Sequence, residues 1–427
     1  MSDGPFVIVS SDGHAGALMA DYPPYIDPEY REEFDAFLGE WDQHGSRNFD
    51  RPALEVRLDR QWVDDWDKKM VITGRVDGFS DAERRLKEAE HEGVVAEVLF
   101  PDFGIPFELH SPAHAEILGI PPRDEEHKRA GMRAFNRWLI DYMSIAPERF
   151  AGMAAVSWQW DIDDAISEIR WAHSSGMKGI VLPQFDPEMP LYHPDFEPIW
   201  NTLEELGMVV NSHSGMSSTS NRPVHTPGLP HPACAFRLRI PEYAFYVHNI
   251  LSHLIWGGVL ERHPNLKFVF TEQGTGWVVP ELQGMDYACD GSFFRTDYRD
   301  VIRLKPSEYF QRQCYVGSSL FSQAEVELRH KIGLDKMMLG MDFPHHEGTL
   351  LETTQEYLRA TLGASHVPVN EARTLLGLTA VDVFGFDLDR LVPVAQRVGL
   401  RPERVLSPPE QNLFPKGDVH KPATFWT

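Results

Sequence analysis

A pair of residues near the N-terminus has the types and the spacing of a metal site. Asp12 and His14 follow Phe6–Val9, an apolar and largely β-branched run that predicts a buried strand. Side chains two residues apart on an extended backbone point to the same face, so a carboxylate oxygen and an imidazole nitrogen would lie together. Such a pair is half of a divalent-metal site. An isolated pair also fits a capping Asp beside a surface His, so the interpretation depends on further ligand candidates.

Those candidates stand where later apolar runs end. They are His213, Glu272 and Asp342, which close the runs at 208–213, 266–272 and 337–342. The carboxyl ends of the strands of an α/β barrel meet at one mouth, where these residues would join the N-terminal pair. Two imidazoles with carboxylates suit zinc, iron or manganese. His345, on the loop after Asp342, is a further candidate for contact with a substrate or the metal.

The elements that must position these residues alternate along the chain. Strands are predicted at 6–9, 94–100, 151–158, 177–183, 208–213, 266–272, 314–317 and 337–342. The helices predicted between them include 80–90, 125–145, 161–174, 196–206 and 243–262. Eight strands that alternate with helices are typical of a (β/α)8 barrel. We therefore predict an α/β protein, a distorted TIM barrel that spans residues 1–392 as one domain.

Two long segments interrupt this pattern, one at 15–81, rich in aromatic and charged residues, and one at 214–242, rich in Pro, Ser and His. Connections of this length are usually functional, so we expect both insertions to lie over the C-terminal mouth of the barrel. The Pro-containing tail at 393–427 predicts an extended arm. We expect this arm and the first insertion to bury surface between subunits of a homo-oligomer.

Composition excludes several classes of protein. The formal net charge of −24 argues against a nucleic-acid partner, which requires a basic face. No apolar run reaches 18 residues, so no membrane span is predicted, and no signal peptide is visible. The 3 cysteines are widely spaced and form no Cys-x-x-Cys motif, which favours a reducing compartment and predicts a cytoplasmic protein.

The chain contains, in order, Ser11-Asp12-Gly13-His14, Pro147-Glu148-Arg149-Phe150, the stretch 191–196, His213-Ser214-Gly215, the stretch 258–267 and Gly340-Met341-Asp342-Phe343-Pro344-His345. Taken together and in this order, these motifs resemble the amidohydrolase superfamily, in the branch that includes aminocarboxymuconate-semialdehyde decarboxylase. The resemblance covers most of the chain from Val7 to Asp387. It implies one metal ion held by Asp12, His14, His213 and Asp342.

This chain departs from the family pattern at two strand ends. The founding hydrolases have His-x-His on strand one, and in this chain Asp12 replaces the first of these His residues. Some decarboxylases of the branch also have an acidic residue at this position. The strand-six position, His in many members, is Glu272. A carboxylate there is a candidate base or a ligand for a second metal ion. No Lys ends the fourth strand at 182–184, so the carbamylated-lysine bridge of the two-zinc hydrolases is not expected.

The resemblance implies a metal-dependent hydrolase or a non-oxidative decarboxylase acting on a small organic acid. We expect zinc, with manganese or iron as alternatives. Asp342 would take the water proton in hydrolysis, whereas Glu272 or a nearby His such as His345 would deliver a proton to carbon in decarboxylation. The alternative is a dinuclear iron or manganese oxygenase on the same fold. Glu272 would then bind a second metal, and a hetero-oligomer with a related subunit becomes possible.

Overall fold

The structure is a computed structural model, and it describes residues 4–47, 49–55, 58–102, 104–107, 123–214, 216–217, 248–291, 297–318, 320–345 and 353–409. Its centre is a parallel sheet whose strands follow one another in chain order from β1 to β8. They are β1 Ile8–Ser10, β2 Val94–Leu99, β3 Phe150–Ala155, β4 Gly179–Val181, β5 Val209–His213, β6 Phe268–Thr271, β7 Cys314–Ser318 and β8 Met337–Leu339. The structure confirms the predicted α/β barrel.

Backbone hydrogen bonds bring the two ends of this sheet together. The amide of Ser11 donates to the carbonyl of Leu339 over 2.7 Å, and Asp342 donates to Asp12 over 2.8 Å. A parallel bridge joins Gly13 to Phe343 just beyond the strands. The barrel is therefore closed at its C-terminal mouth by the segments that follow β1 and β8.

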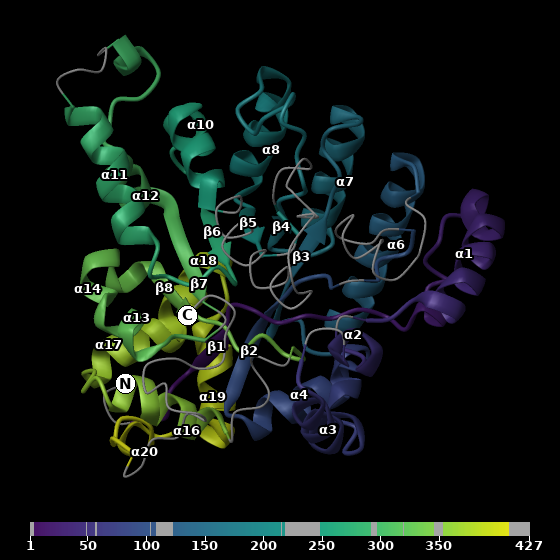
Figure 1. Ribbon diagram of the computed structural model, residues 1–427, viewed down its shortest axis with the longest axis horizontal. Helices are drawn as coiled ribbons and strands as arrows, with labels where there is room; N and C mark the ends of the chain where they lie inside the picture. The colour runs from purple at the N-terminus through teal and green to yellow at the C-terminus, as the bar shows by residue number, and fades with distance from the viewer. Residues whose placement is uncertain are drawn as a thin grey trace, which may run out of the picture.

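Helices surround the strands (Figure 1). The α-helices are α1 Arg31–His44, α2 Arg51–Glu55, α3 Arg60–Trp66, α4 Ala82–His91, α6 Glu125–Met143, α7 Ile162–Ser174, α8 Glu197–Leu206, α10 Val259–Arg262, α11 Val278–Asp290, α12 Pro306–Gln313, α13 Gln323–Glu327, α14 Arg329–Ile332, α16 Thr354–Leu358, α17 Val369–Arg373, α18 Thr379–Phe384, α19 Leu388–Val398 and α20 Pro402–Val405. Short 3-10 or π segments are η1 Met19–Asp21, η2 Pro28–Tyr30, η3 Asp67–Val71, η4 Val76–Phe79, η5 Pro194–Phe196, η6 Asp297–Asp300, η7 Leu334–Lys336, η8 Arg359–Gly363 and η9 Thr374–Leu378. No helix in these ranges is both long and apolar enough to cross a membrane.

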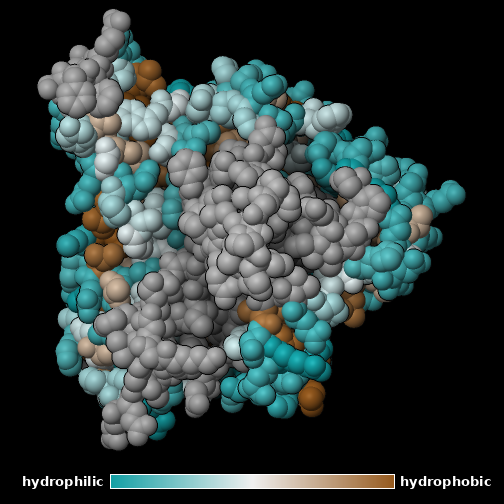
Figure 2. All heavy atoms as spheres, viewed as in Figure 1, coloured by the Kyte–Doolittle hydropathy of each residue, from teal (hydrophilic) through white to brown (hydrophobic). Residues whose placement is uncertain are grey.

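Local sequence signals explain where several helices begin and end. Asp81 and Asp161 precede α4 and α7, and each side chain accepts a hydrogen bond from a first-turn amide. Gly207 ends α8 in the left-handed conformation, with φ of 65°. The helix predicted at 243–262 is interrupted, because Gly258 has φ of 75° and separates the helical residues 248–256 from α10. Figure 2 shows a mainly hydrophilic surface around α1, in keeping with the acidic composition.

Two apolar layers hold the barrel together. One lies between the strands and the surrounding helices, and the other fills the barrel interior with side chains such as Val9, Val95 and Met153. Leu391 and Ala395 of α19 belong to this interior cluster. The extended arm predicted from residue 393 is therefore wrong for 393–398, where α19 stays helical through Pro393 because its apolar face is buried. Residues 410–427 of that arm lie outside the described chain.

The first predicted insertion, 15–81, folds as short helices from η1 to η4. They follow β1 and so lie on the side of the barrel where the candidate ligands converge. The second, 214–242, falls outside the described residues except for 214, 216 and 217.

Candidate metal centre

Asp12 and His14 lie just beyond β1, in a backbone segment held from both sides. His14 donates its amide hydrogen to the carbonyl of Phe343 over 2.7 Å, and a parallel bridge joins His14 to Phe100 after β2. The side chains of Asp12 and His14 are both fully buried. The Nε2 atom of His14 lies 3.8 Å from Oδ1 of Asp12. The pair predicted from the sequence therefore forms, although β1 itself ends earlier, at Ser10.

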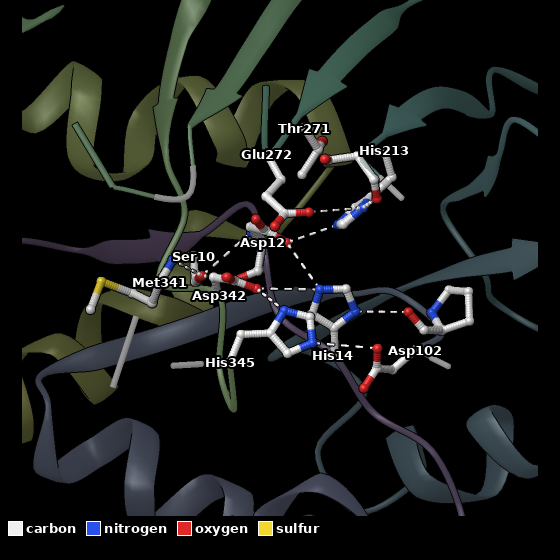
Figure 3. A network of polar contacts seen from close by, with 12 residues as sticks. Ser10, Asp12, His14, Asp102, His213, Thr271, Glu272, Met341, Asp342 and His345 are labelled. Atoms are coloured by element: carbon white, nitrogen blue, oxygen red, sulfur yellow. Dashed lines mark hydrogen bonds and ion pairs between the residues drawn. The ribbon is translucent and has the colours of Figure 1, made fainter. Parts of the chain in front are cut away.

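His213 ends β5 and brings a second imidazole to the same point (Figure 3). Its Nε2 lies 3.2 Å from Oδ1 of Asp12, and its ring meets the His14 ring edge-on with centroids 4.9 Å apart. Asp342, beyond β8, closes the group with Oδ1 3.3 Å from Nε2 of His14. The structure brings together the four residues that the resemblance implied.

The orientation of the two rings favours a cation between these groups. Nδ1 of His14 lies 2.7 Å from the carbonyl of Pro101, and Nδ1 of His213 lies 2.6 Å from the carbonyl of Ser214. A carbonyl only accepts, so each Nδ1 carries the hydrogen and the Nε2 of a neutral ring presents a lone pair. Both lone pairs then face carboxylate oxygens, which accept but do not donate. A metal ion resolves this conflict, and a hydrogen-bonded Nδ1 is the usual state of a metal-ligating histidine.

Unsatisfied atoms at the same place agree with this interpretation. Within the described residues, Nε2 of His14 and both carboxylate oxygens of Asp342 are buried without a well-formed hydrogen bond. Buried polar atoms normally have partners, and exceptions require an explanation such as an ion. Among the residues that the structure describes, close ligand atoms form two groups that share His14, namely Asp12–His14–His213 and His14–Asp342–His345. Imidazole nitrogens with carboxylate oxygens suit zinc, manganese or iron.

Two residues at these strand ends have unusual backbone conformations. Asp342 has φ of 51° and Glu272 has φ of 56°, in the left-handed region that non-glycine residues seldom occupy. Such conformations cost about 1–3 kcal/mol and cluster at functional sites. The surrounding barrel therefore holds both carboxylates in directions that an unconstrained backbone would avoid.

His345 extends the group away from Asp342. Its Nδ1 lies 3.0 Å from Oδ1 of Asp342, its Nε2 lies 3.3 Å from Oδ1 of Asp102, and its ring stacks on His14 with centroids 4.1 Å apart. Burial lowers the pKa of His345, but the charges of Asp342 and Asp102 outweigh it and raise the pKa well above its usual value. The ring thus lies between two carboxylates. Asp102 follows β2. Its contact with His345 depends on packing between segments far apart in the chain, which the sequence does not display.

Glu272 lies beside His213 (Figure 3). Its Oε2 is 3.5 Å from Nδ1 of His213, the nitrogen that also faces the Ser214 carbonyl. In the described part of the chain, neither group of close ligand atoms includes Glu272. The geometry places this carboxylate beside a candidate ligand, where it can orient the ring.

A cavity of about 250 Å3 opens next to this centre. Most of its lining comes from the first insertion, including Trp41, Arg47 and Phe79, and Asp102 lines it from the side of the barrel. Because Asp102 also contacts His345, the cavity and the polar cluster are neighbours. A molecule in the cavity would lie beside the candidate metal centre.

Comparisons with known proteins agree with this fold. The model of the Amidohydrolase family matches residues 96–386, and the chain belongs to this family. A curated relative, 2-amino-3-carboxymuconate-6-semialdehyde decarboxylase of Dictyostelium discoideum, is 24% identical over 262 residues, which are 59% of this chain and 66% of the relative. This chain thus matches just under two thirds of that protein's length.

Solved structures of similar fold include decarboxylases. The 5-carboxyvanillate decarboxylase of Sphingomonas paucimobilis is 19% identical, with a TM-score of 0.61 and coverage of 90% of this chain and 100% of that one. The dihydroxybenzoic acid decarboxylase of Polaromonas sp., solved with manganese and 2-nitroresorcinol, is 16% identical, with a TM-score of 0.57 and coverage of 89% and 97%. At such identities these similarities establish the fold alone.

Proposed function

We propose that the protein is a metal-dependent, non-oxidative decarboxylase of a small aromatic carboxylic acid, with one divalent ion bound by Asp12, His14, His213 and Asp342. The observation that carries the proposal is the pair of buried Nε2 atoms aimed at carboxylate oxygens at the barrel mouth. The activities named for the similar proteins support the reaction class.

The cavity beside the centre suits an aromatic substrate. A dry cavity of about 150 Å3 is enough for benzene, so about 250 Å3 accommodates a benzene ring with polar substituents. Trp41, Phe79 and Phe135 supply apolar surface for the ring, and Asp102 provides an acceptor for a substrate hydroxyl. A bound divalent ion would supply a Lewis acid that fixes the substrate carboxylate and a neighbouring oxygen.

His345 is the best-placed proton donor. When the bond between the ring carbon and the carboxylate breaks, carbon dioxide leaves and the electron pair on the ring carbon takes one proton. His345 lies between Asp342 and Asp102, whose negative charges favour its protonated form, and Asp102 lines the cavity. Glu272 contacts the His213 ring and is not part of the close group of described residues that contains His345. We therefore assign proton delivery to His345, metal binding to Asp342 and orientation of His213 to Glu272.

The hydrolase and oxygenase alternatives have less support. A hydrolase would use Asp342 as a base for water, but here this carboxylate contacts both His14 and His345. An oxygenase would need a second metal near Glu272, and the ligand groups found among the described residues leave it out.

Two measurements on the purified protein test the proposal. Elemental analysis should find one divalent ion per chain, and the metal-free protein should regain activity with zinc, manganese or iron, which identifies the preferred ion. A panel of hydroxybenzoates should release carbon dioxide, and in deuterium oxide the product should carry one deuterium at the carbon that lost the carboxylate. Asp342→Asn should abolish the release. Cleavage of amides or esters without carbon dioxide release, or two irons per chain with oxygen consumption, would refute decarboxylation.

A further inference from the structure

A buried arginine lies directly behind the backbone that carries the candidate ligands. Arg85 belongs to α4, which packs against β2, and its side chain is 1% exposed. Its Nε and Nη2 donate to the two carboxylate oxygens of Glu97 on β2, over 2.8 and 3.0 Å. Arginine retains its charge even when buried. The two hydrogen bonds to the Glu97 carboxylate balance that charge.

The same guanidinium contacts both segments that close the barrel. Nη1 of Arg85 donates to the carbonyl of His14 over 2.9 Å. The guanidinium carbon lies 4.1 Å from the centre of the Phe343 ring, close enough for a cation–π contact. His14 comes from the start of the chain, and Phe343 lies between the ligand candidates Asp342 and His345. One side chain thus touches both halves of the proposed ligand set through their backbone neighbours.

Gly13 is the residue that admits this guanidinium. A Cβ atom at position 13 would lie 2.6 Å from Nη2 of Arg85 and 3.5 Å from Oε1 of Glu97. Real Cβ atoms essentially never approach a heavy atom so closely, and the guanidinium is fixed by its pairing with Glu97. The glycine between Asp12 and His14 therefore leaves room for Arg85 on the side opposite the ligands.

We propose that Arg85 is a positioning residue for the metal centre, one that aligns the Asp12–His14 segment with the Asp342–His345 segment; this inference rests on the metal site of the proposed function. The two segments are already joined by backbone hydrogen bonds, in which the amide of His14 donates to the carbonyl of Phe343 and the amide of Asp342 donates to the carbonyl of Asp12. Arg85 adds a charged hydrogen bond to the carbonyl of His14 on one segment and a cation–π contact with the ring of Phe343 on the other. Partners outside the ligand set that orient metal ligands typically contribute 10- to 100-fold in metal affinity, roughly the effect expected here.

A purely structural role would be to neutralise Glu97, and a pair of variants separates the two roles. Arg85→Met leaves a buried, unpaired carboxylate and can destabilise the fold for that reason alone. The double variant Arg85→Met with Glu97→Met removes both charges and keeps similar volumes. Arg84→Met is the matched control, because Arg84 directly precedes Arg85 on α4 and pairs with Glu88 at a partly exposed position.

The first readout is metal binding by the full chain, freed of metal and titrated with zinc or manganese alone. We expect the double variant to bind the ion about 10- to 100-fold more weakly than the wild type, and Arg84→Met to match the wild type. Wild-type affinity in the double variant would overturn the inference and leave Arg85 as a partner of Glu97 only.

The second readout needs no metal. Hydrogen exchange of the metal-free protein should be faster in the double variant at the amides of His14 and Asp342, with no change in Arg84→Met. Unchanged protection at both amides would overturn the inference. If the wild type binds no divalent ion, the proposed function fails at its metal site, and the exchange measurement alone then decides whether Arg85 aligns the two segments.

Discussion

Replacing His14 by alanine should remove most of the affinity for the proposed metal ion, because His14 is the residue that the two groups of close ligand atoms share. A four-ligand zinc site contributes about 10–16 kcal/mol of binding free energy in small zinc domains, so one ligand in four corresponds to about 3 kcal/mol. At 1.4 kcal/mol per factor of ten, this loss weakens binding by roughly 100-fold. It also leaves Asp12 and Asp342 without the imidazole between them, which adds repulsion between two buried carboxylates.

The assay is isothermal titration of the metal-free variant with zinc, together with elemental analysis of the protein as purified. His173→Ala is the control, since His173 is an exposed residue in the last turn of α7. The control should bind one ion with wild-type affinity, whereas His14→Ala should be purified with little metal and show no decarboxylation. Full occupancy and unchanged affinity in a folded His14→Ala protein would refute the assignment of this centre.

Three further predictions concern other parts of the molecule. Glu272→Gln should keep one ion per chain while the rate falls about 10- to 100-fold, since the carboxylate orients His213; loss of one of two ions would instead identify a second metal site. Glu90 has a pKa lowered to about 2, chiefly by its hydrogen bond from Arg397. Because the folded-state pKa is depressed, this pair stabilises the fold above about pH 4, the unfolded value, and the stabilisation disappears as pH falls toward 2. Arg397→Gln should therefore cost about 1 kcal/mol or less in urea unfolding at pH 7 and nothing near pH 2, and an equal cost at both pH values would contradict the ion pair. Light scattering at micromolar concentration should give at least a dimeric mass, and a monomeric mass would contradict the expected homo-oligomer.

The sequence was sufficient to predict the barrel and the convergence of its strand ends. Each strand is a short apolar run, and helix caps such as Asp81 and Asp161 are local signals. His213 ends its strand as predicted, and Asp342 follows its strand closely. These features depend on spacing within a few residues, which a sequence displays directly.

Features that depend on packing between distant segments were not predictable in the same way. Asp102 follows an apolar run, a place where an aspartate can equally cap a turn, and only the fold shows that it lies 3.3 Å from His345. Arg85 is one of several charged residues in its helix. No local signal in the sequence indicates that its side chain is buried against Glu97 and Gly13. Pro393 suggested an extended arm, whereas burial of Leu391 and Ala395 against the apolar cluster of the barrel favours a helix.

The closure of the barrel has a consequence for how the protein matures. The hydrogen bond from the amide of Met341 to Oγ of Ser10 joins residues 331 positions apart, and the proposed ligands come from both sides of this junction. A growing chain therefore carries Asp12 and His14 long before Asp342 exists. At about 5–20 residues per second, synthesis of the 331 residues from Ser10 to Met341 takes roughly 20–70 seconds, and no complete set of ligands is available during that time. Capture of the ion would then be one of the last steps of maturation, and a bound ion would report that the final strand has joined the first.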